Sequence, residues 1–283
     1  MKFNKIAIVG LGLIGGSLAL ALKESKQVET VVGIDTDDDS IKYAFDNKII
    51  DEGASDINKV ISDSEIIVLS TYVGSIADTA KSVLELATDG SIITDTGSVK
   101  SSIVQEIESS LPENLHFVAG HPIAGTENSG VKSADSNLFK GKRAILTPTD
   151  KTDIDSKNKV KTMWEAVGAE VFEMDPSTHD HIFGRLSHMP PVVAYSLINS
   201  VLNAEDSDEL LEFAGGGLKD YTRVSASSPE MWSQIFSANK DQLMDAIAIF
   251  KNSLRRIEQA IENEDFDTLK KELEKAAKAK RSL

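Results

Sequence analysis

Apolar runs of strand length alternate with stretches of helical periodicity through the first 174 residues. The pattern predicts strands at 5–9, 30–34, 66–69, 91–94, 115–119 and 143–147 and near 169–173, and helices at 13–25, 40–47, 75–87, 100–110 and 156–167. Strands that alternate with helices favour a mostly parallel sheet covered on both faces. We therefore expect an α/β fold whose N-terminal part is a Rossmann-type, doubly wound sheet.

The pattern changes after Pro176, where strand-like runs largely disappear. Helical periodicity is found at 178–203, 207–214, 229–259 and 265–280. From residue 244 to 261 the apolar residues stay on a single face over several turns, namely Met244, Ile247, Phe250, Leu254, Ile257 and Ile261. We place a domain boundary at residue 174, which divides the chain into a dinucleotide-binding domain (1–174) and an all-α domain (175–283).

Composition narrows the possible partners and compartments. The chain has 283 residues, and 41% of them are hydrophobic. It contains no run of the ~20 apolar residues that a membrane span needs, and its opening residues pass at once into a strand, so no signal peptide is predicted. It has no cysteine, which excludes disulfides, thiolate nucleophiles and Cys-ligated metals and fits a cytoplasmic location. No metal site is predicted.

The net charge of −15 argues against nucleic acid or an anionic membrane as the main partner. An acidic protein also repels an anionic substrate at long range. A site for such a substrate therefore needs positive charges of its own.

A glycine-rich motif between the first strand and the first helix predicts a dinucleotide site. Gly10, Gly12 and Gly15 form G-x-G-x-x-G, with Leu13 and Ile14 at the start of the helix. We expect Gly10 to make the tight turn, Gly12 to let backbone amides approach a pyrophosphate, and Gly15 to permit close helix–strand packing. The alternative is an ordinary glycine-rich turn beside a surface aspartate.

Asp35 strengthens this interpretation because it ends the second strand, twenty residues after Gly15. A carboxylate at this position accepts hydrogen bonds from a ribose diol and repels a 2′-phosphate, so NAD is favoured over NADP. Three further aspartates at 37–39 add to the negative field. Ser70 and Thr71 follow another strand and are predicted at the same edge, where cofactors sit.

His121 is the strongest candidate for chemistry. It lies between Gly120 and Pro122, which predict a turn at the end of a strand, where open sheets bind ligands. Catalytic and structural roles both fit a histidine in this setting. Ser98 precedes a predicted helix, where it is either a site residue or an N-cap for the first-turn amides.

Two segments of the helical part carry further candidates. Ser187 and His188 lie in its first helical segment, and a glycine triplet at 215–217 leads to Lys219, Asp220 and Arg223. Backbone amides and cations in such a loop suit a substrate carboxylate. The alternative is a flexible interhelical turn with solvated cations.

Together these motifs resemble the prephenate/arogenate dehydrogenase family of tyrosine biosynthesis. The resemblance runs along nearly the whole chain through GLGLIGGS at 10–17, GSVK at 97–100, GHPIAGTE at 120–127, ILTP at 145–148, the His179–Asp180 pair, Ser187–His188 and GGGLKDYTR at 215–223. Several matches in the right order are more specific than any single motif.

The resemblance implies NAD⁺-dependent oxidative decarboxylation of prephenate to 4-hydroxyphenylpyruvate. It implies that His121 takes up the proton of the ring hydroxyl, that Ser98 helps to hold His121 and that hydroxyl, and that Arg223 binds a substrate carboxylate. It also places Thr126, Ser187, His188, Lys219 and Asp220 in the substrate pocket. The helical domain is implied to form a homodimer in which Trp232 reaches the partner's site.

One departure from the family pattern concerns substrate choice. Many prephenate-using members read Ser-His-Leu-Pro-His where this chain ends the motif with Pro191. Members without that second histidine include enzymes that use arogenate, so arogenate dehydrogenase is an alternative. Two others are a 3-hydroxyacid type of dehydrogenase, which relies on a lysine in the helical domain, and a dinucleotide-sensing protein without turnover. A sensor needs only the glycines and Asp35.

Overall fold

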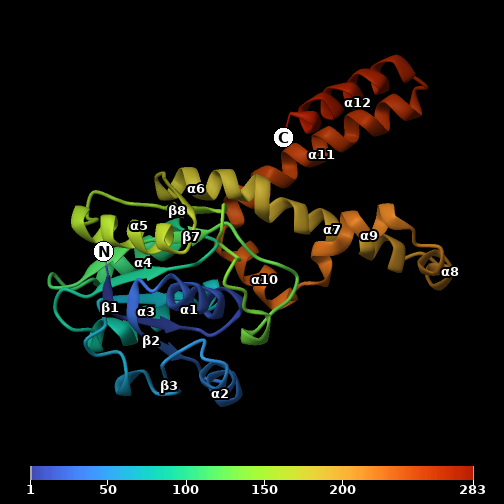
Figure 1. Ribbon diagram of the computed structural model, residues 1–283. Helices are drawn as coiled ribbons and strands as arrows, with labels where there is room; N and C mark the ends of the chain where they lie inside the picture. Colours follow the sequence, from blue (N-terminus) through green and yellow to red (C-terminus); the bar gives the residue numbers. More distant parts are fainter. Residues whose placement is uncertain (1, 283) are drawn as a thin grey trace.

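The computed structural model describes residues 2–282, and its centre is a sheet of six parallel strands (Figure 1). The strand order is β3-β2-β1-β4-β5-β6. The strands are β1 (Phe3–Val9), β2 (Val28–Ile34), β3 (Glu52–Ala54), β4 (Ile66–Leu69), β5 (Ile92–Asp95) and β6 (His116–Val118). The order reverses between β1 and β4, so the carboxyl ends of these two strands form the edge where doubly wound sheets bind ligands.

Helices cover both faces of this sheet because its strands are apolar on both sides. In β1, Ile6 and Ile8 belong to the core under α1 (Leu13–Ser25) and α5 (Ile154–Ala166). Ala7 and Val9 belong to the opposite core, under α3 (Val73–Leu86) and α4 (Ser101–Ser110). The alternation follows from the two-residue period of a strand. The helix α2 (Asp38–Asp46) connects β2 to β3.

A second, three-stranded sheet continues from β6. It contains β7 (Gly120–Pro122), β8 (Arg143–Leu146) and β9 (Glu170–Glu173), with β7 antiparallel to β8 and β8 parallel to β9. The predicted turn at Gly120–Pro122 is therefore wrong, because His121 pairs with Ile145 in a strand. Strands of three residues, such as β3 and β7, are too short to show a period.

Every element described after Glu173 is helical. The α-helices are α6 (Pro176–Phe183), α7 (Met189–Leu202), α8 (Ser207–Glu212), α9 (Gly216–Thr222), α10 (Pro229–Ala238), α11 (Lys240–Glu262) and α12 (Phe266–Arg281). A π-helical turn, Gly184–His188, joins α6 to α7, and 3-10 turns occupy Ile57–Lys59, Val131–Ser133 and Arg223–Ala226. The domain boundary at 174 stays a prediction; the structure gives the change of element type on either side of it.

Two long predicted helices are interrupted in the structure. The segment 178–203 contains the π-turn, and 229–259 breaks at Asn239, whose side chain is committed to contacts with α6 and the π-turn. The glycine triplet, predicted as a loop, instead opens α9, with Gly215 at its N-cap. Periodicity does not reveal breaks that tertiary contacts impose.

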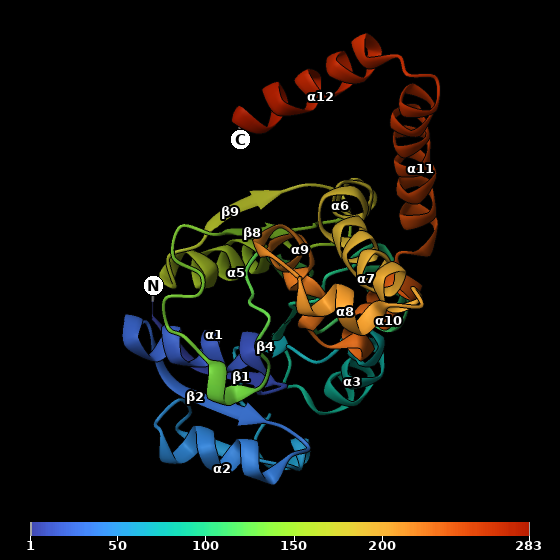
Figure 2. The ribbon, with the colours of Figure 1, turned by 90° about the vertical axis from the view of Figure 1, so that its right-hand side faces the viewer.

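The helical part projects from the sheet, and α11 and α12 form a hairpin that stands away from the rest of the molecule (Figures 1 and 2). Its core is small and centres on Met189, Leu243 and Ala246. Large apolar side chains remain exposed on these helices, among them Leu202, Phe213, Tyr221, Met244, Leu254, Ile261 and Phe266. None of the described helices is both long and apolar enough to cross a membrane.

Candidate active site

The glycine motif forms a cradle at the carboxyl end of β1. Gly10 has φ +103°, and a Cβ on it would lie 2.5 Å from the carbonyl oxygen of Ser70. A Cβ on Gly15 would lie 2.0 Å from the carbonyl oxygen of Gly10, whereas one on Gly12 would meet open space. Gly12 is the N-cap of α1 and caps it without a side chain. The first-turn amides of α1, including those of Leu13 and Ile14, therefore lie beside open space that suits a pyrophosphate.

Asp35 lies at the end of β2 and holds this cradle. Its Oδ2 accepts a hydrogen bond from the amide of Leu11 at 2.7 Å, and its Oδ1 accepts one from the amide of Asp37 at 3.0 Å. The side chain of Asp37 caps the N-terminus of α2 through the amides of Asp39 and Ser40. The carboxylate of Asp35 is thus adjacent to the glycine loop, as ribose recognition requires.

Ser70 and Thr71 complete the same edge. The Ser70 hydroxyl accepts a hydrogen bond from Thr96 Oγ1 at 3.1 Å, which connects the end of β4 to the end of β5. Thr71 Oγ1 is buried and finds no hydrogen-bond partner among the described residues. A buried hydroxyl without a partner is costly unless a ligand supplies one. The glycine cradle and this hydroxyl therefore fit a dinucleotide.

Replacing Asp35 with alanine is expected to relax the cofactor preference. The change removes the carboxylate that recognises a ribose diol and repels a 2′-phosphate, so kcat/KM for NAD⁺ falls while that for NADP⁺ rises. Steady-state kinetics with both cofactors measure the ratio. Asp39→Ala is the matched control because Asp39 also lies on this acidic segment. An unaltered ratio in Asp35→Ala would remove Asp35 from cofactor recognition.

His121 lies on β7 and forms the end of a buried chain of hydrogen bonds. Its Nδ1 is 2.8 Å from Nε2 of His179, and Nδ1 of His179 is 2.9 Å from Oδ1 of Asp180. The Phe183 ring packs against both imidazoles, with ring centroids 5.2 Å from His121 and 4.5 Å from His179. His121 is 7% exposed. Since Nδ1 is engaged by His179, Nε2 is the nitrogen left for substrate.

A buried ion pair lies behind His121. Lys100 is fully buried, and its ammonium donates hydrogen bonds to Asp95 and, at 2.6 Å, to the carbonyl oxygen of Gly120. The other Asp95 contacts are with backbone amides, at 2.9 Å from Gly97 and 3.1 Å from Gly120. The end of β5, the start of α4 and the start of β7 are therefore joined by one set of polar contacts.

Asp180 joins the helical part to this network. Its carboxylate accepts hydrogen bonds from the backbone amides of Lys100 and Ser101, each at 2.8 Å, at the N-terminus of α4. The α4 amides are thus capped by a residue of α6, and the N-cap interpretation of Ser98 is wrong. Ser98 is half-buried, and its hydroxyl makes no hydrogen bond within residues 2–282, which leaves it available to a ligand.

His188 lies in the π-turn and is buried, and its Nε2 finds no hydrogen-bond partner among residues 2–282. Its Nδ1 is 3.1 Å from Nδ2 of Asn239, which also donates to the carbonyl oxygen of Asp180 at 2.9 Å. Burial and the neighbouring His179 lower the pKa of His188 to about 4, against opposing effects of Asp180 and the Ser98 backbone. His188 is therefore neutral around pH 7, and its contact with Asn239 connects the π-turn to the break between α10 and α11. Isolated π-turns often occur at functional sites.

The electrostatic surroundings keep His121 neutral. The pKa of His121 is held well below its usual value, chiefly by burial and also by the nearby His179, Lys100 ammonium and His188. Burial also lowers the pKa of His179, against the opposing influence of Asp180. Burial alone raises the pKa of Asp180, but hydrogen bonds from His179, Ser101 and the α4 amides outweigh it and leave that pKa lowered. Around neutral pH the chain thus consists of two neutral imidazoles and a carboxylate.

The expected substrate residues are brought together only in part. Arg223 reaches the loop after β7, where its guanidinium is 2.6 Å from Oε2 of Glu127, next to Thr126. Ser187 is half-buried in the π-turn. Lys219 and Asp220 are exposed on α9 and form no ion pair with any residue from 2 to 282. Trp232 on α10 donates to its own Ser227, at 2.7 Å, so its role in a partner's site stays a prediction.

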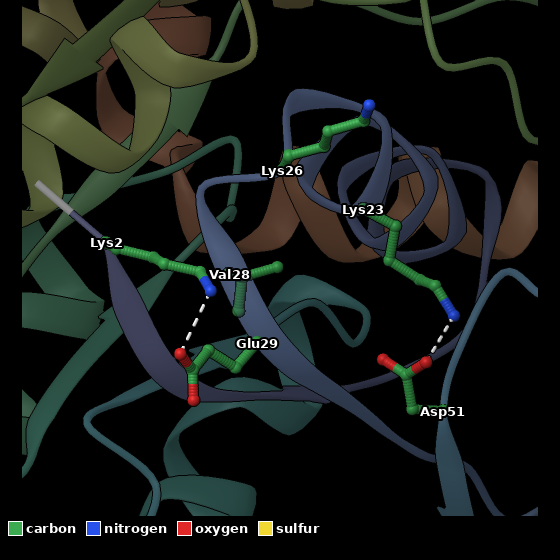
Figure 3. A pocket seen from close by; sticks show the side chains of 6 residues that line it. All are labelled: Lys2, Lys23, Lys26, Val28, Glu29 and Asp51. Atoms are coloured by element: carbon green, nitrogen blue, oxygen red, sulfur yellow. Dashed lines mark hydrogen bonds and ion pairs between the residues drawn. The ribbon is translucent and has the colours of Figure 1, made fainter.

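A hollow at the opposite edge of the sheet, away from the glycine cradle, is lined mostly by charged side chains. It is lined by Val28 and by Lys2, Lys23, Lys26, Glu29 and Asp51 (Figure 3). Two ion pairs, Lys2–Glu29 at 2.9 Å and Lys23–Asp51 at 2.5 Å, engage most of its charges. Its residues lie at the amino ends of β1, β2 and β3 and at the carboxyl end of α1, away from the glycine cradle. No cluster of three or more metal-ligating side chains is found within the part of the chain described.

Sequence reasoning missed several residues of the buried network. Asp95 belongs to none of the motifs, and Lys100 only ends the GSVK motif, although a charged residue directly after an apolar strand, and another five residues later, is a readable signal. The His179–Asp180 pair entered only through the family resemblance. No local pattern marks Asn239, because its role depends on which helices meet around it.

A dinucleotide cradle and a neutral, buried histidine at the same sheet edge define the class: a dinucleotide-dependent oxidoreductase. Models of the prephenate dehydrogenase nucleotide-binding and dimerization domains match residues 18–173 and 175–275. The chain belongs to the prephenate dehydrogenase family.

Individual relatives agree with this assignment. The chain is 35% identical to the prephenate dehydrogenase of Bacillus subtilis, over 94% of this chain and 72% of that protein. It is 32% identical to the cyclohexadienyl dehydrogenase of Zymomonas mobilis, over 99% of this chain and 96% of that protein. The crystal structure of Aquifex aeolicus prephenate dehydrogenase with hydroxyphenyl propionate and NAD⁺ is 40% identical and superposes with a TM-score of 0.93, covering 100% of this chain and 98% of that one.

Proposed function

We propose that this protein catalyses the NAD⁺-dependent oxidative decarboxylation of prephenate to 4-hydroxyphenylpyruvate in tyrosine biosynthesis. The observation that carries the proposal is the position of His121. Hydrogen bonds connect Gly120 to Asp95 at the end of β5, and Thr96 to Ser70 beside the glycine cradle. The histidine is thus held at the same sheet edge as the cofactor cradle, in a chain of this family.

The cofactor is NAD, which Gly10, Gly12, Gly15 and Asp35 would hold. When bound, it supplies the hydride acceptor of the reaction. The glycine loop and the first-turn amides of α1 suit the pyrophosphate, and the Asp35 carboxylate suits a ribose without a 2′-phosphate. The NAD⁺ bound to the Aquifex aeolicus relative supports this assignment.

His121 acts on the substrate hydroxyl. In its neutral form, Nε2 accepts the hydroxyl proton while the C4–H bond gives up its hydride, which leaves a carbonyl at C4. Loss of the ring carboxylate as CO₂ turns this carbonyl into a phenolate, and the phenolate takes the proton back from His121 to give the phenol. We assign Ser98 to hold the same hydroxyl, since its own hydroxyl is free to do so. His188 stays a predicted pocket residue, since its Nε2 is buried without a hydrogen-bond partner in the described part of the chain.

Arg223 is assigned to a substrate carboxylate. Its side chain is 66% exposed and pairs with Glu127, so a guanidinium is present beside the loop that follows β7. A planar guanidinium binds a carboxylate in bidentate fashion. It also supplies the local positive charge that an acidic protein needs to bind an anionic substrate. Lys219, Asp220, Thr126 and Ser187 stay predicted pocket residues.

Replacing Arg223 with alanine is expected to raise KM for the substrate by about 10- to 100-fold and to change kcat much less, since the lost contact serves binding. Initial rates over a range of substrate concentrations separate the two parameters. Arg256→Ala is the control, because Arg256 on α11 forms a similarly exposed pair with Glu272 on α12. A fall in kcat with KM unchanged would contradict the assignment.

Arogenate is the second candidate substrate, and Pro191 is the observation that favours it. Pro191 is buried at the start of α7, where it offers neither a backbone donor nor a polar side chain. A member with histidine at this position has a hydrogen-bonding group that this chain lacks. One assay decides between the substrates: NADH formation with purified protein and NAD⁺, with prephenate and arogenate offered in parallel. Turnover of neither by folded, NAD⁺-binding protein would refute the proposed activity.

We also propose that the helical part forms a homodimer. Apolar side chains on α7, α8, α9 and α11 are exposed in the single chain, whereas the family model matching 175–275 describes a dimerization domain. A second copy that covers these faces would remove them from water. Analytical ultracentrifugation of the full chain is expected to give twice the monomer mass of 30.6 kDa. A folded monomer at micromolar concentration would overturn this proposal. The cytoplasmic location stays a prediction from composition.

A further inference from the structure

The chain of two imidazoles and a carboxylate behind His121 has only one consistent pattern of protons. The Asp180 carboxylate, whose pKa is lowered, is an acceptor, so the Nδ1 of His179, 2.9 Å away, must be the donor. A neutral imidazole carries one N–H, which leaves Nε2 of His179 as an acceptor. The contact of 2.8 Å from that atom to His121 then requires Nδ1–H on His121.

We propose that His179 and Asp180 are positioning residues that fix the tautomer of His121 and leave its Nε2 free to accept the substrate proton. The inference rests on the proposed function and deepens it. Neutral imidazole has two tautomers, and only the one with a bare Nε2 can take a proton at the atom that faces the site. Asp180 selects the tautomer of His179, and His179 selects that of His121.

The location of Asp180 makes this selection robust. Its two oxygens also accept the amides of Lys100 and Ser101, so the carboxylate stands at the positive end of α4 and cannot rotate without losing both contacts. Phe183 packs against both imidazole rings and excludes water from the chain. His179 itself has no exposed surface. Solvent therefore cannot supply the competing donor that would reverse the tautomers.

The same chain supports His121 after it has taken the proton. The imidazolium that forms is nearly buried and lies close to the Lys100 ammonium, whose charge opposes it. The acceptor Nε2 of His179 and, behind it, the Asp180 carboxylate provide the compensating negative potential. A group that only packs against His121 would not provide it, and this distinguishes a positioning role from a purely structural one.

Two substitutions of His179 separate its contact with Asp180 from its contact with His121. In His179→Asn the shorter side chain retains a donor for Asp180 but no atom for His121, whereas in His179→Gln an amide oxygen can still accept from His121. We expect kcat to fall by about 10²-fold in His179→Asn and by less than about 10-fold in His179→Gln, with NAD⁺ affinity unchanged in both. His181→Asn, two residues along the same helix and exposed, is the control and keeps wild-type kcat.

A spectroscopic measurement tests the tautomer without substrate. Long-range ¹H–¹⁵N spectra of ¹⁵N-histidine-labelled protein contain only five histidines, and His121→Asn identifies the relevant signals. The expected result is a protonated Nδ1 and a bare Nε2 on His121 in the wild type, with a mixture of tautomers in His179→Asn. Asp180→Asn keeps a side-chain oxygen that can cap α4, and this variant is also expected to show a mixture of His121 tautomers.

Two results would overturn the inference. One is a wild-type spectrum in which His121 carries its proton on Nε2, and the other is wild-type kcat in folded His179→Asn. Failure of the proposed function would give a different result from either of these. In that case the wild type oxidises neither prephenate nor arogenate, while the spectrum still reports the tautomer.

Discussion

His121→Asn is expected to lower kcat by about 10²- to 10⁴-fold, the largest loss of activity from any single change in this site. The asparagine amide retains a donor for Nε2 of His179 near the position of the lost Nδ1, so the buried chain stays paired. It places nothing at the position of Nε2, and the substrate hydroxyl then has no proton acceptor. Stopped-flow or steady-state formation of NADH measures the loss.

Binding and pH dependence show whether this loss is chemical. NAD⁺ affinity, measured by fluorescence titration, is expected to be unchanged because His121 lies outside the glycine cradle. In the wild type, the acid limb of kcat/KM is expected below pH 6.5, since burial, His179 and Lys100 lower the pKa of His121 and the reactive form is the neutral one. Unchanged turnover in His121→Asn would remove this histidine from the mechanism, and an acid limb above 6.5 would contradict its electrostatics.

Lys100→Met is expected to lower the free energy of unfolding by about 3–5 kcal/mol. Both side chains of the Asp95–Lys100 pair are fully buried, and methionine leaves the Asp95 carboxylate without its cation. The carbonyl of Gly120 also loses its donor. Because that carbonyl belongs to the strand that carries His121, activity should fall together with stability. Equilibrium urea unfolding followed by circular dichroism measures the effect.

The double variant Asp95→Asn/Lys100→Met separates charge from packing. Removing both charges abolishes the uncompensated carboxylate, so the double variant is expected to be more stable than Lys100→Met alone. Lys2→Met is the control, because the Lys2–Glu29 pair is exposed on both sides and is worth less than about 1 kcal/mol. Loss of less than about 1 kcal/mol in Lys100→Met would show that the buried pair does not stabilise the fold.

Much of the fold could be predicted because its strands are apolar and its helices are long. The predicted strand at 66–69 and helix at 13–25 have the observed bounds, and the other long elements shift by one to three residues. The errors occur where local pattern is absent or tertiary contacts prevail. β7 is three residues long, α9 opens on a glycine triplet that has low helix propensity, and Asn239 interrupts a continuous helical periodicity.

The residues of the candidate site could be predicted where they belong to one local motif, but not where distant segments bring them together. The glycine cradle and Asp35 are local features of one strand–helix–strand unit, and the structure places them together. His121 and Arg223 are 102 positions apart in the sequence, and only the contact of Arg223 with Glu127 shows that the 3-10 turn after α9 meets the loop after β7. Lys219 and Asp220 share the motif of Arg223 and are exposed as Arg223 is, but they form no ion pair among residues 2–282, because neighbouring residues of a helix face different directions.

The sequence by itself determined the alternation of strands and helices, the dinucleotide motif, the change to helices after Pro176 and the family. These follow from periodicity and short motifs, which need no knowledge of distant contacts. Only the tertiary structure decided that Asp180 rather than Ser98 caps α4, that His188 is buried, and that His121, His179 and Asp180 share one line of protons. Those facts depend on α6 meeting α4 and β7, and hydrogen bonds between such distant segments exist only once the chain has folded.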